Sequence, residues 1–172
     1  MARKLITTLF PIFILNIILG TAASAQTPNI PAPPIIGAKS YLIIDATTNY
    51  EIGSLDPDLK LPPASITKLM TAYVTFQAIK NKQIFLEDLV TISEKAWRME
   101  GSRMFIEVGK KVLVKDLIQG VIVQSGNDAS VALAEHIAGG EEFFVTMLNK
   151  LAYDLELKNT NFETNCKNTY CA

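Results

Sequence analysis

Histidine and cysteine are scarce in this sequence. The 172 residues include one histidine and two cysteines, and both cysteines, Cys166 and Cys171, lie in the last seven residues. Two cysteines at one end cannot form a disulfide framework for the whole chain. A single histidine leaves little scope for a metal site or a catalytic triad built on imidazole. These two absences exclude disulfide-rich scaffolds and disfavour histidine-based chemistry.

Charged residues are also few, and neither sign dominates. Only 19% of the residues are charged, whereas 49% are hydrophobic, a balance that excludes intrinsic disorder. There are 16 basic and 17 acidic residues and no basic run, which argues against nucleic-acid binding. The length suits one domain and is sufficient for a sizeable core.

The N-terminus has the pattern of a secretory signal. Two basic residues precede an apolar run over 5–19, and small residues then lead to a cleavage position after Ala25. The alternative is a transmembrane anchor, but a span needs about 20 apolar residues and this run is interrupted by Pro11 and Asn16. We therefore predict a signal peptide over 1–25 and an exported, mildly acidic mature protein.

The remaining sequence predicts one hairpin followed by helices. Residues 26–34 form a proline-rich extended lead, and β-rich segments over 39–45 and 50–55 predict the hairpin. The predicted helices cover about 65–80, a brief turn from the cap residue Ser93 to Trp97, 114–124, 128–138 with Asp128 as its cap, and about 141–155. The apolar residues expected to form the buried face of the first helix are Ile66, Leu69, Met70, Tyr73, Val74 and Phe76.

The first candidate for chemistry is Ser65-Ile66-Thr67-Lys68 at the start of a predicted helix. Residues three apart share a helix face, so the lysine amine can reach the serine hydroxyl. Serine needs a base to become a nucleophile, and lysine can serve once its pKa falls towards 7–8. The helix N-terminus would favour a developing oxyanion. The alternative is a helix-capping serine beside a solvated lysine.

The second candidate is Ser125-Gly126-Asn127, between two predicted helices. A hydroxyl there can pass a proton to a leaving group, and the asparagine amide can hold a substrate carbonyl. The alternative is an ordinary turn, because serine, glycine and asparagine all favour turns. The two motifs together, in an exported protein, favour a serine-based active site over two coincidental turns.

The combination resembles a known family. Ser-x-x-Lys followed by Ser-x-Asn is the pattern of penicillin-binding proteins and serine β-lactamases. The strings PPASITKLMTAYV at 62–74, GSRMFIEVG at 101–109 and VIVQSGNDASVALAEHIAG at 121–139 resemble the D-alanyl-D-alanine carboxypeptidases among the low-molecular-mass penicillin-binding proteins. The likeness runs from about 35 to 164. It implies an α+β domain of the β-lactamase/transpeptidase-like fold, present here in part.

The resemblance also implies roles for four residues. Ser65 would be the acylated nucleophile, Lys68 the general base, Ser125 the proton relay to the leaving D-alanine, and Asn127 a ligand of the substrate carbonyl. The substrate would be a peptidoglycan stem peptide ending in D-Ala-D-Ala, with β-lactams as inhibitors and with no metal, cofactor or nucleic acid. The family works in the periplasm, often held at the inner membrane by a C-terminal amphipathic helix that has no counterpart here.

The sequence departs from the family pattern near its end. Relatives carry a Lys-Thr-Gly motif on a strand beside the nucleophile, and this chain has neither Lys-Thr-Gly nor Lys-Ser-Gly. Residues 165–172 do not resemble the family and contain both cysteines. We interpret 35–164 as a partial domain that lacks the later sheet strands, and 165–172 as a tail produced by a frameshift or early stop near Thr164. The alternative for the tail is a Cys166–Cys171 disulfide in an oxidising periplasm.

Two other functions fit the same motifs. A class A β-lactamase would use the same serine chemistry, but that family favours Ser-Asp-Asn where Ser125-Gly126-Asn127 stands. A non-catalytic fragment is the other alternative. Rapid turnover of nitrocefin would favour the β-lactamase, and a lack of labelling by a fluorescent penicillin would favour the inert fragment.

We predict negligible carboxypeptidase activity for the 172 residues by themselves. Loss of a single oxyanion-hole donor costs about 10²–10³ in rate, and here a whole substrate-binding strand has no counterpart. The measurement is D-alanine release from diacetyl-lysyl-D-Ala-D-Ala by the purified protein with no complementing fragment. Measurable release would contradict the prediction.

Overall fold

The structure is a computed structural model that describes residues 35–165. The predicted signal peptide over 1–25, the proline-rich lead over 26–34 and the two cysteines lie outside the described residues. The chain divides into two compact units, Met1–Asp58 and Leu59–Ala172. The expected α+β class is confirmed.

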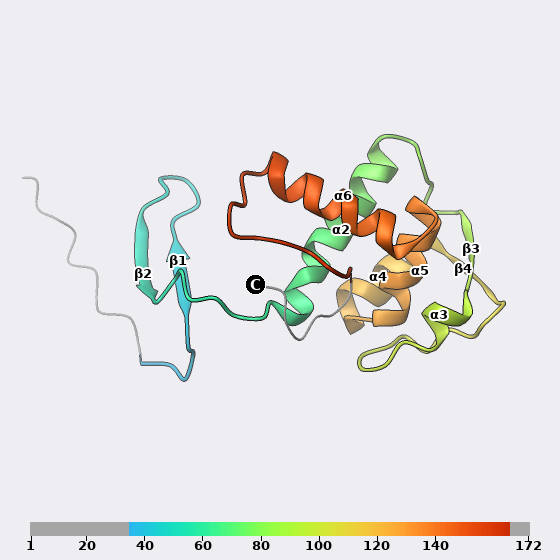
Figure 1. Ribbon diagram of the computed structural model, residues 1–172, viewed down its shortest axis with the longest axis horizontal. Coiled ribbons are helices and arrows are strands. Elements are labelled where there is room, and N and C mark those ends of the chain that lie inside the picture. The colour runs from blue at the N-terminus through green and yellow to red at the C-terminus, as the bar shows by residue number, and fades with distance from the viewer. Residues whose placement is uncertain (1–34, 166–172) are drawn as a thin grey trace, which may run out of the picture. The chain divides into compact units, whose positions relative to one another are not determined.

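The described part of the first unit is a two-stranded hairpin. Strands β1 (Tyr41–Ile44) and β2 (Glu51–Leu55) pair antiparallel, with Tyr41 opposite Leu55 (Figure 1). The Asp45 carboxylate shapes the turn by accepting hydrogen bonds from the Thr48 hydroxyl and amide, each at 2.7 Å. These bonds from Thr48 lower the pKa of Asp45. The hairpin predicted from the sequence is confirmed.

The second unit is mainly helical. Its elements in chain order are η1 (Ala64–Ile66, a 3₁₀ turn), α2 (Thr67–Lys80), β3 (Leu89–Thr91), α3 (Glu94–Trp97), β4 (Lys111–Leu113), α4 (Val114–Gln124), α5 (Asn127–Ala138) and α6 (Glu141–Asp154). All the predicted helices form. Ser93 caps α3 as predicted, since its hydroxyl accepts from the Ala96 amide at 3.0 Å. Gly139, with φ of 75°, ends α5 in the left-handed conformation that suits glycine.

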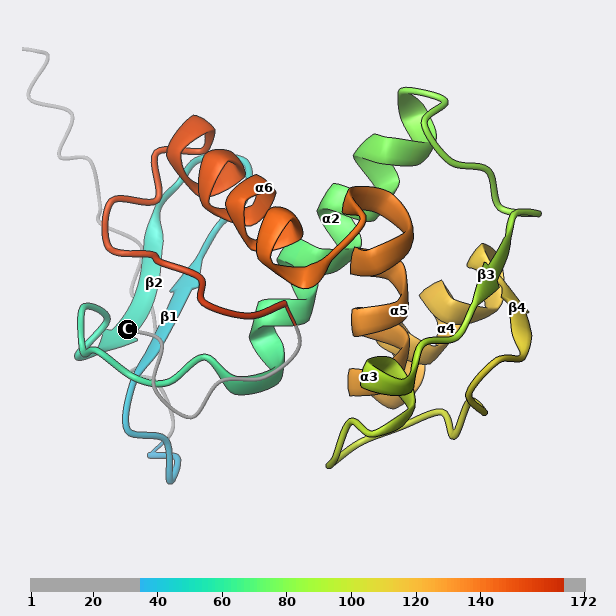
Figure 2. The same cartoon turned by 45° about the vertical axis from the view of Figure 1, so that its right-hand side comes forward.

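Helix α5 forms the centre of this unit. Every residue from Asn127 to Ala134 is buried, and α5 contacts α2, α3, α4, α6 and β3. Figure 2 shows α5 with α2 and α6 on one side and α4 and the β3–β4 sheet on the other. Two hydrophobic clusters meet there, one around Leu117, Val121 and Leu133 and the other around Phe144 and Leu148. The α4–α5 junction is therefore held on a fully packed helix.

A second small sheet was not indicated by the sequence pattern. Strands β3 and β4 pair antiparallel, with Leu89 opposite Leu113 and Val90 opposite Val112. Each strand has only three residues, and the long segment between them contains α3. Such short strands show too few alternations for a period of two to be recognised.

The predicted buried face of the first helix is wrong at four of its six residues, whereas Val74 is buried as predicted and Met70 packs against a core cluster. Ile66 is 66% exposed and Leu69 is 70% exposed, and Tyr73 and Phe76 are exposed as well. The buried residues of α2 are Thr67, Lys68, Thr71, Val74, Thr75 and Ala78. Threonine and alanine side chains are short, so they let α2 approach α5 and α6 closely. The apolar pattern identified the helix correctly but only part of the side that packs.

Asn165 joins the end of the described chain to this helical core. It is fully buried, although it is the first residue of the predicted 165–172 tail. Its backbone carbonyl accepts from the Thr71 hydroxyl of α2 at 2.6 Å, and its side-chain amide donates to the Ser130 carbonyl of α5 at 2.6 Å. The segment after α6 is thus fastened to α2 and α5 by polar contacts.

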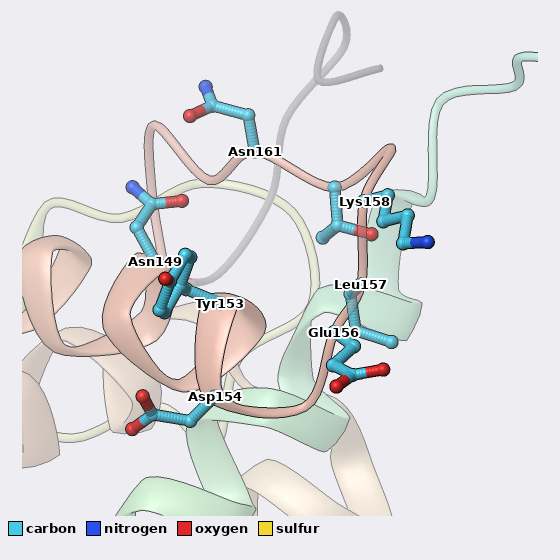
Figure 3. Close-up of a pocket in the computed structure, with 8 residues that line it drawn as sticks. Asn149, Tyr153, Asp154, Glu156, Leu157, Lys158 and Asn161 are labelled. Atoms are coloured by element: carbon cyan, nitrogen blue, oxygen red, sulfur yellow. The ribbon is translucent and has the colours of Figure 1, made fainter.

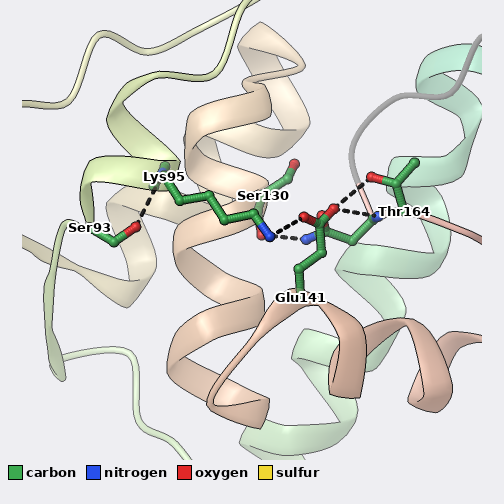
Figure 4. A network of polar contacts seen from close by, with 7 residues as sticks. Ser93, Lys95, Ser130, Glu141 and Thr164 are labelled. Carbon is green, nitrogen blue, oxygen red and sulfur yellow. Dashed lines mark hydrogen bonds and ion pairs between the residues drawn. The ribbon is translucent and has the colours of Figure 1, made fainter.

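Glu141 connects the same segment to α3 (Figure 4). Its carboxylate pairs with the Lys95 amine at 2.8 Å and accepts from the Thr164 hydroxyl at 2.6 Å. Burial by itself would raise the pKa of Glu141, but the bonds from Lys95 and Thr164 outweigh it and lower the pKa. The hydrogen bond to Glu141 raises the pKa of Lys95.

We expect Glu141→Gln to lower the free energy of unfolding at neutral pH by about 1 kcal/mol, because Lys95 is half exposed and the pair is partly screened. Since folding lowers the pKa of Glu141, its contribution is present above the ordinary value of 4.5 and is lost as the pH falls below it. The raised pKa of Lys95 adds stability that is lost only above its ordinary 10.5. Urea unfolding at about pH 7 and pH 3 measures both stabilities.

Wild type and Glu141→Gln should therefore differ at pH 7 and converge at pH 3. The neighbouring Glu142 is exposed and lies in the same first turn of α6, so Glu142→Gln controls for the helix dipole. An equal loss of stability in Glu142→Gln, or a gap that stays unchanged in acid, would contradict the assignment.

Candidate active site

Ser65 lies in the tight turn that begins the α2 segment. Two prolines precede this turn, and Ala64 has φ of 46°, in the left-handed region that non-glycine residues seldom adopt. The predicted helix from Ser65 thus begins as the 3₁₀ turn η1 and becomes α-helical at Thr67. Ser65 is exposed, so its hydroxyl is accessible to a substrate.

Lys68 brings the four predicted site residues together. Its Nζ lies 3.4 Å from Ser65 Oγ, 3.2 Å from Ser125 Oγ and 2.7 Å from Asn127 Oδ1. Only 5% of Lys68 is exposed, which is the opposite of the solvated lysine considered as the alternative. A buried amine needs polar partners, and oxygens from η1, the α4–α5 junction and α5 supply them. Polar side chains of both motifs therefore meet at one nitrogen atom, Lys68 Nζ.

Ser125 reaches Lys68 through a tight junction between α4 and α5. It ends α4 in the left-handed conformation, with φ of 54°. Gly126 follows, and its amide donates to the Gly120 carbonyl at 2.9 Å. A Cβ at Gly126 would lie 3.0 Å from Asp128 Oδ1 and 3.2 Å from Gly120 O, so a side chain would not fit without movement. The Ser-Gly-Asn motif is a turn, as the alternative held, and this turn delivers a hydroxyl to Lys68.

The orientation of the Asn127 amide is fixed by its partners. Its Nδ2 donates to the Glu100 carbonyl at 2.6 Å, and its backbone amide donates to the Ser102 carbonyl at 2.8 Å. A carbonyl can only accept, so the amide nitrogen must face Glu100. The remaining Oδ1 then faces the amine of Lys68. Asn127 is 2% exposed, and in this state its side chain is committed to these two partners.

Asp128 does not cap α5, and this prediction is wrong. Helix α5 begins at Asn127, with Gly126 at the cap position and no side-chain cap. The Asp128 carboxylate instead accepts from the backbone amides of Met104, Phe105 and Ile106, at 3.0, 2.9 and 3.3 Å. An acidic residue directly after Ser-Gly-Asn is typical of a helix cap. No sequence signal indicates that the backbone amides of a distant loop bind this carboxylate instead.

A small cavity adjoins the serine and lysine side chains. Its volume is about 160 Å³, and it is lined by Ser65, Lys68, Leu69, Ala72, Val121, Ile122 and Ser125. The hydroxyls and the amine lie beside apolar side chains of α2 and α4. The cavity is thus lined partly by the polar groups of the two serines and the lysine and partly by apolar side chains.

A larger hollow has a different lining. It has a volume of about 800 Å³ and is formed by the C-terminal half of α6 and the loop after it, including Tyr153, Glu156 and Lys158 (Figure 3). None of the four predicted site residues lines it. The catalytic candidates therefore belong to the small cavity.

The arrangement is suited to moving protons between two hydroxyls. Lys68 Nζ is within hydrogen-bonding distance of both serine oxygens, so an amine there can receive a proton from one and deliver it to the other. Among residues 35–165, no group of three or more His, Cys, Asp or Glu side chains lies close enough to hold a metal ion. No helix within that range has the length and apolar character needed to cross a membrane.

The fold is similar to that of solved penicillin-binding proteins. Penicillin-binding protein 5 from Haemophilus influenzae matches with a TM-score of 0.77 and 45% identity over 80% of this chain and 41% of that one. Penicillin-binding protein 6B from Escherichia coli matches with a TM-score of 0.75 and 43% identity over 83% of this chain and 47% of that one. The expected penicillin-binding, transpeptidase-like fold is confirmed.

Sequence comparison specifies the family. The family model described as D-alanyl-D-alanine carboxypeptidase matches residues 26–166. The D-alanyl-D-alanine carboxypeptidase DacD of Escherichia coli K12 is 43% identical over 170 residues, covering 95% of this chain and 43% of the relative. DacA of Haemophilus influenzae is 47% identical over 135 residues, covering 77% and 34%. The chain belongs to the D-alanyl-D-alanine carboxypeptidase family, and it spans about two fifths or less of the length of these relatives.

Proposed function

We propose that this site is the acylation centre of a serine-type D-Ala-D-Ala carboxypeptidase that acts on peptidoglycan stem peptides. The observation that supports the proposal best is the position of Lys68 Nζ, which lies between Ser65 Oγ and Ser125 Oγ and against Asn127 Oδ1. Family membership supports the reaction class, and the contacts of Lys68 support the roles proposed for the individual residues.

In the acylation step, Ser65 Oγ attacks the carbonyl carbon of the penultimate D-alanine. Its proton passes to the neutral amine of Lys68, 3.4 Å away. The peptide C–N bond then breaks, and the leaving nitrogen of D-alanine takes the hydroxyl proton of Ser125. Lys68 returns a proton to Ser125 across 3.2 Å. The products are an ester on Ser65 and free D-alanine.

Hydrolysis of the ester reverses these transfers. Water attacks the ester carbonyl and gives a proton to Lys68, which passes it to the departing Ser65 oxygen. The shortened peptide leaves as a carboxylic acid, and the serine is restored. A β-lactam would acylate Ser65 by the same attack, but its leaving nitrogen remains tethered after the ring opens. The adduct would therefore persist longer than the peptide acyl-enzyme.

We propose further that a carboxypeptidase with this site, completed by the substrate-binding strand of the family, acts in the periplasm, where it trims stem peptides and so affects cell-wall assembly and cell shape. The charged, apolar and small-residue order of the first 25 residues supports export. The proposed partners are the stem peptide and β-lactams.

We predict that a fluorescent penicillin labels the purified protein at Ser65, because the strained lactam ring is a more reactive acyl donor than a peptide. Ser65→Ala should abolish the label. Lys68→Ala should slow labelling by about 10²–10⁴-fold, the usual contribution of a general base. Gel fluorescence and the mass of the Ser65 peptide measure the adduct.

Ser93→Ala is the matched control, because Ser93 also lies at a helix N-terminus but far along the chain from the site. It should label as wild type does. Absence of label in wild type, or undiminished label in Ser65→Ala, would overturn the proposed function.

A further inference from the structure

We propose that Asp128 is a positioning residue for the acylation centre and acts through the loop over 100–106 and the amide of Asn127. This inference rests on the proposed function. The four hydrogen bonds to the Asp128 carboxylate come from backbone amides and not from the serine or lysine side chains of the centre. Its carboxylate instead holds the loop whose carbonyls orient Asn127.

The Asp128 carboxylate is fully buried and saturated by backbone amides. Oδ1 accepts from Met104 N at 3.0 Å and from Ala129 N at 2.8 Å, and Oδ2 accepts from Phe105 N at 2.9 Å and from Ile106 N at 3.3 Å. A carboxylate is the side-chain group that offers acceptors on both oxygens. Three consecutive loop amides therefore converge on one residue of α5.

The same loop returns two contacts to the residue before Asp128. The Glu100 carbonyl accepts from Asn127 Nδ2 at 2.6 Å, and the Ser102 carbonyl accepts from the Asn127 amide at 2.8 Å. The first contact determines which end of the Asn127 amide faces Lys68. Displacement of the loop would remove that constraint, and Asn127 Oδ1 would no longer be held 2.7 Å from Lys68 Nζ.

The loop adopts a conformation that needs external support. Phe105 has φ of 62°, which is unusual for a bulky residue and costs about 1–3 kcal/mol. Met104 packs so closely on α4 that a Cβ at Gly120 would lie 2.3 Å from its Sδ. The amides of Phe105 and Ile106, on either side of the strained Phe105 Cα, both donate to Asp128 Oδ2. The carboxylate is thus placed to stabilise the strained conformation.

Asp128→Asn is the informative substitution because it keeps the size of the side chain. In either orientation of the amide, its NH₂ group would face two backbone N–H groups that now donate to an oxygen. We expect the rate of Ser65 acylation by benzylpenicillin to fall by about 10–100-fold, the effect of a misplacement near 1 Å. Leu148→Ala, in the core cluster of α6, is the control for general destabilisation and should acylate normally.

A double-mutant cycle with Asn127→Ala tests the route of the effect. If Asp128 acts through Asn127, Asp128→Asn should change the acylation rate less than about twofold in the Asn127→Ala background. Normal acylation of Asp128→Asn, or a full further loss in that background, would overturn the inference while leaving the proposed function intact.

Hydrogen exchange, followed spectroscopically, tests the positioning of the Asn127 side chain independently of enzymatic activity. The side-chain amide protons of Asn127 should exchange slowly in wild type and faster in Asp128→Asn, with no change in Leu148→Ala. Unchanged exchange in Asp128→Asn would refute the positioning role. If wild type fails to react with penicillin, the proposed function falls and this measurement still decides whether Asp128 holds Asn127.

Discussion

The site depends on one buried amine and the oxygens that surround it. Lys68 is almost completely buried, and a buried amine is tolerated only with polar partners. Its contacts with Ser65, Ser125 and Asn127 come from three local structures: the turn η1, the end of α4 and the start of α5. Ala64 and Ser125 both adopt left-handed conformations to present these contacts. Backbone strain is thus found next to Ser65 and at Ser125, the two residues whose hydroxyls contact Lys68.

Packing around α5 makes this arrangement rigid. The residues of α5 from Asn127 to Ala134 are buried, and the helices that carry the other site residues pack against it. Two polar clusters complete the packing on either side. Asp128 holds the loop before β4, and Asn165 joins α2 to α5 through Thr71 and Ser130. Both clusters satisfy buried polar groups, so they fix positions that apolar packing would leave less specific.

The sequence allowed the helices and the first hairpin to be predicted, and it singled out four residues that the structure brings together, because each has a local signature. Helical periodicity placed α4, α5 and α6, and the two motifs identified the residues around Lys68. The predictions that failed concern contacts with residues distant in sequence. The buried face of α2 was misjudged because Ile66 and Leu69 are exposed while Thr71 and Thr75 are buried. Asp128 was taken for a cap because its amide partners lie more than twenty residues earlier.

Chemical rescue tests the central claim about Lys68 most directly. Removal of the lysine side chain in Lys68→Ala leaves a space between Ser65 and Ser125, and a small primary amine in solution can occupy it. Acylation of Lys68→Ala by benzylpenicillin should be accelerated by methylamine or ethylamine in proportion to the unprotonated amine. The same amines should have no effect on Ser65→Ala. If the amines fail to accelerate acylation in Lys68→Ala, Lys68 is not the proton acceptor of Ser65.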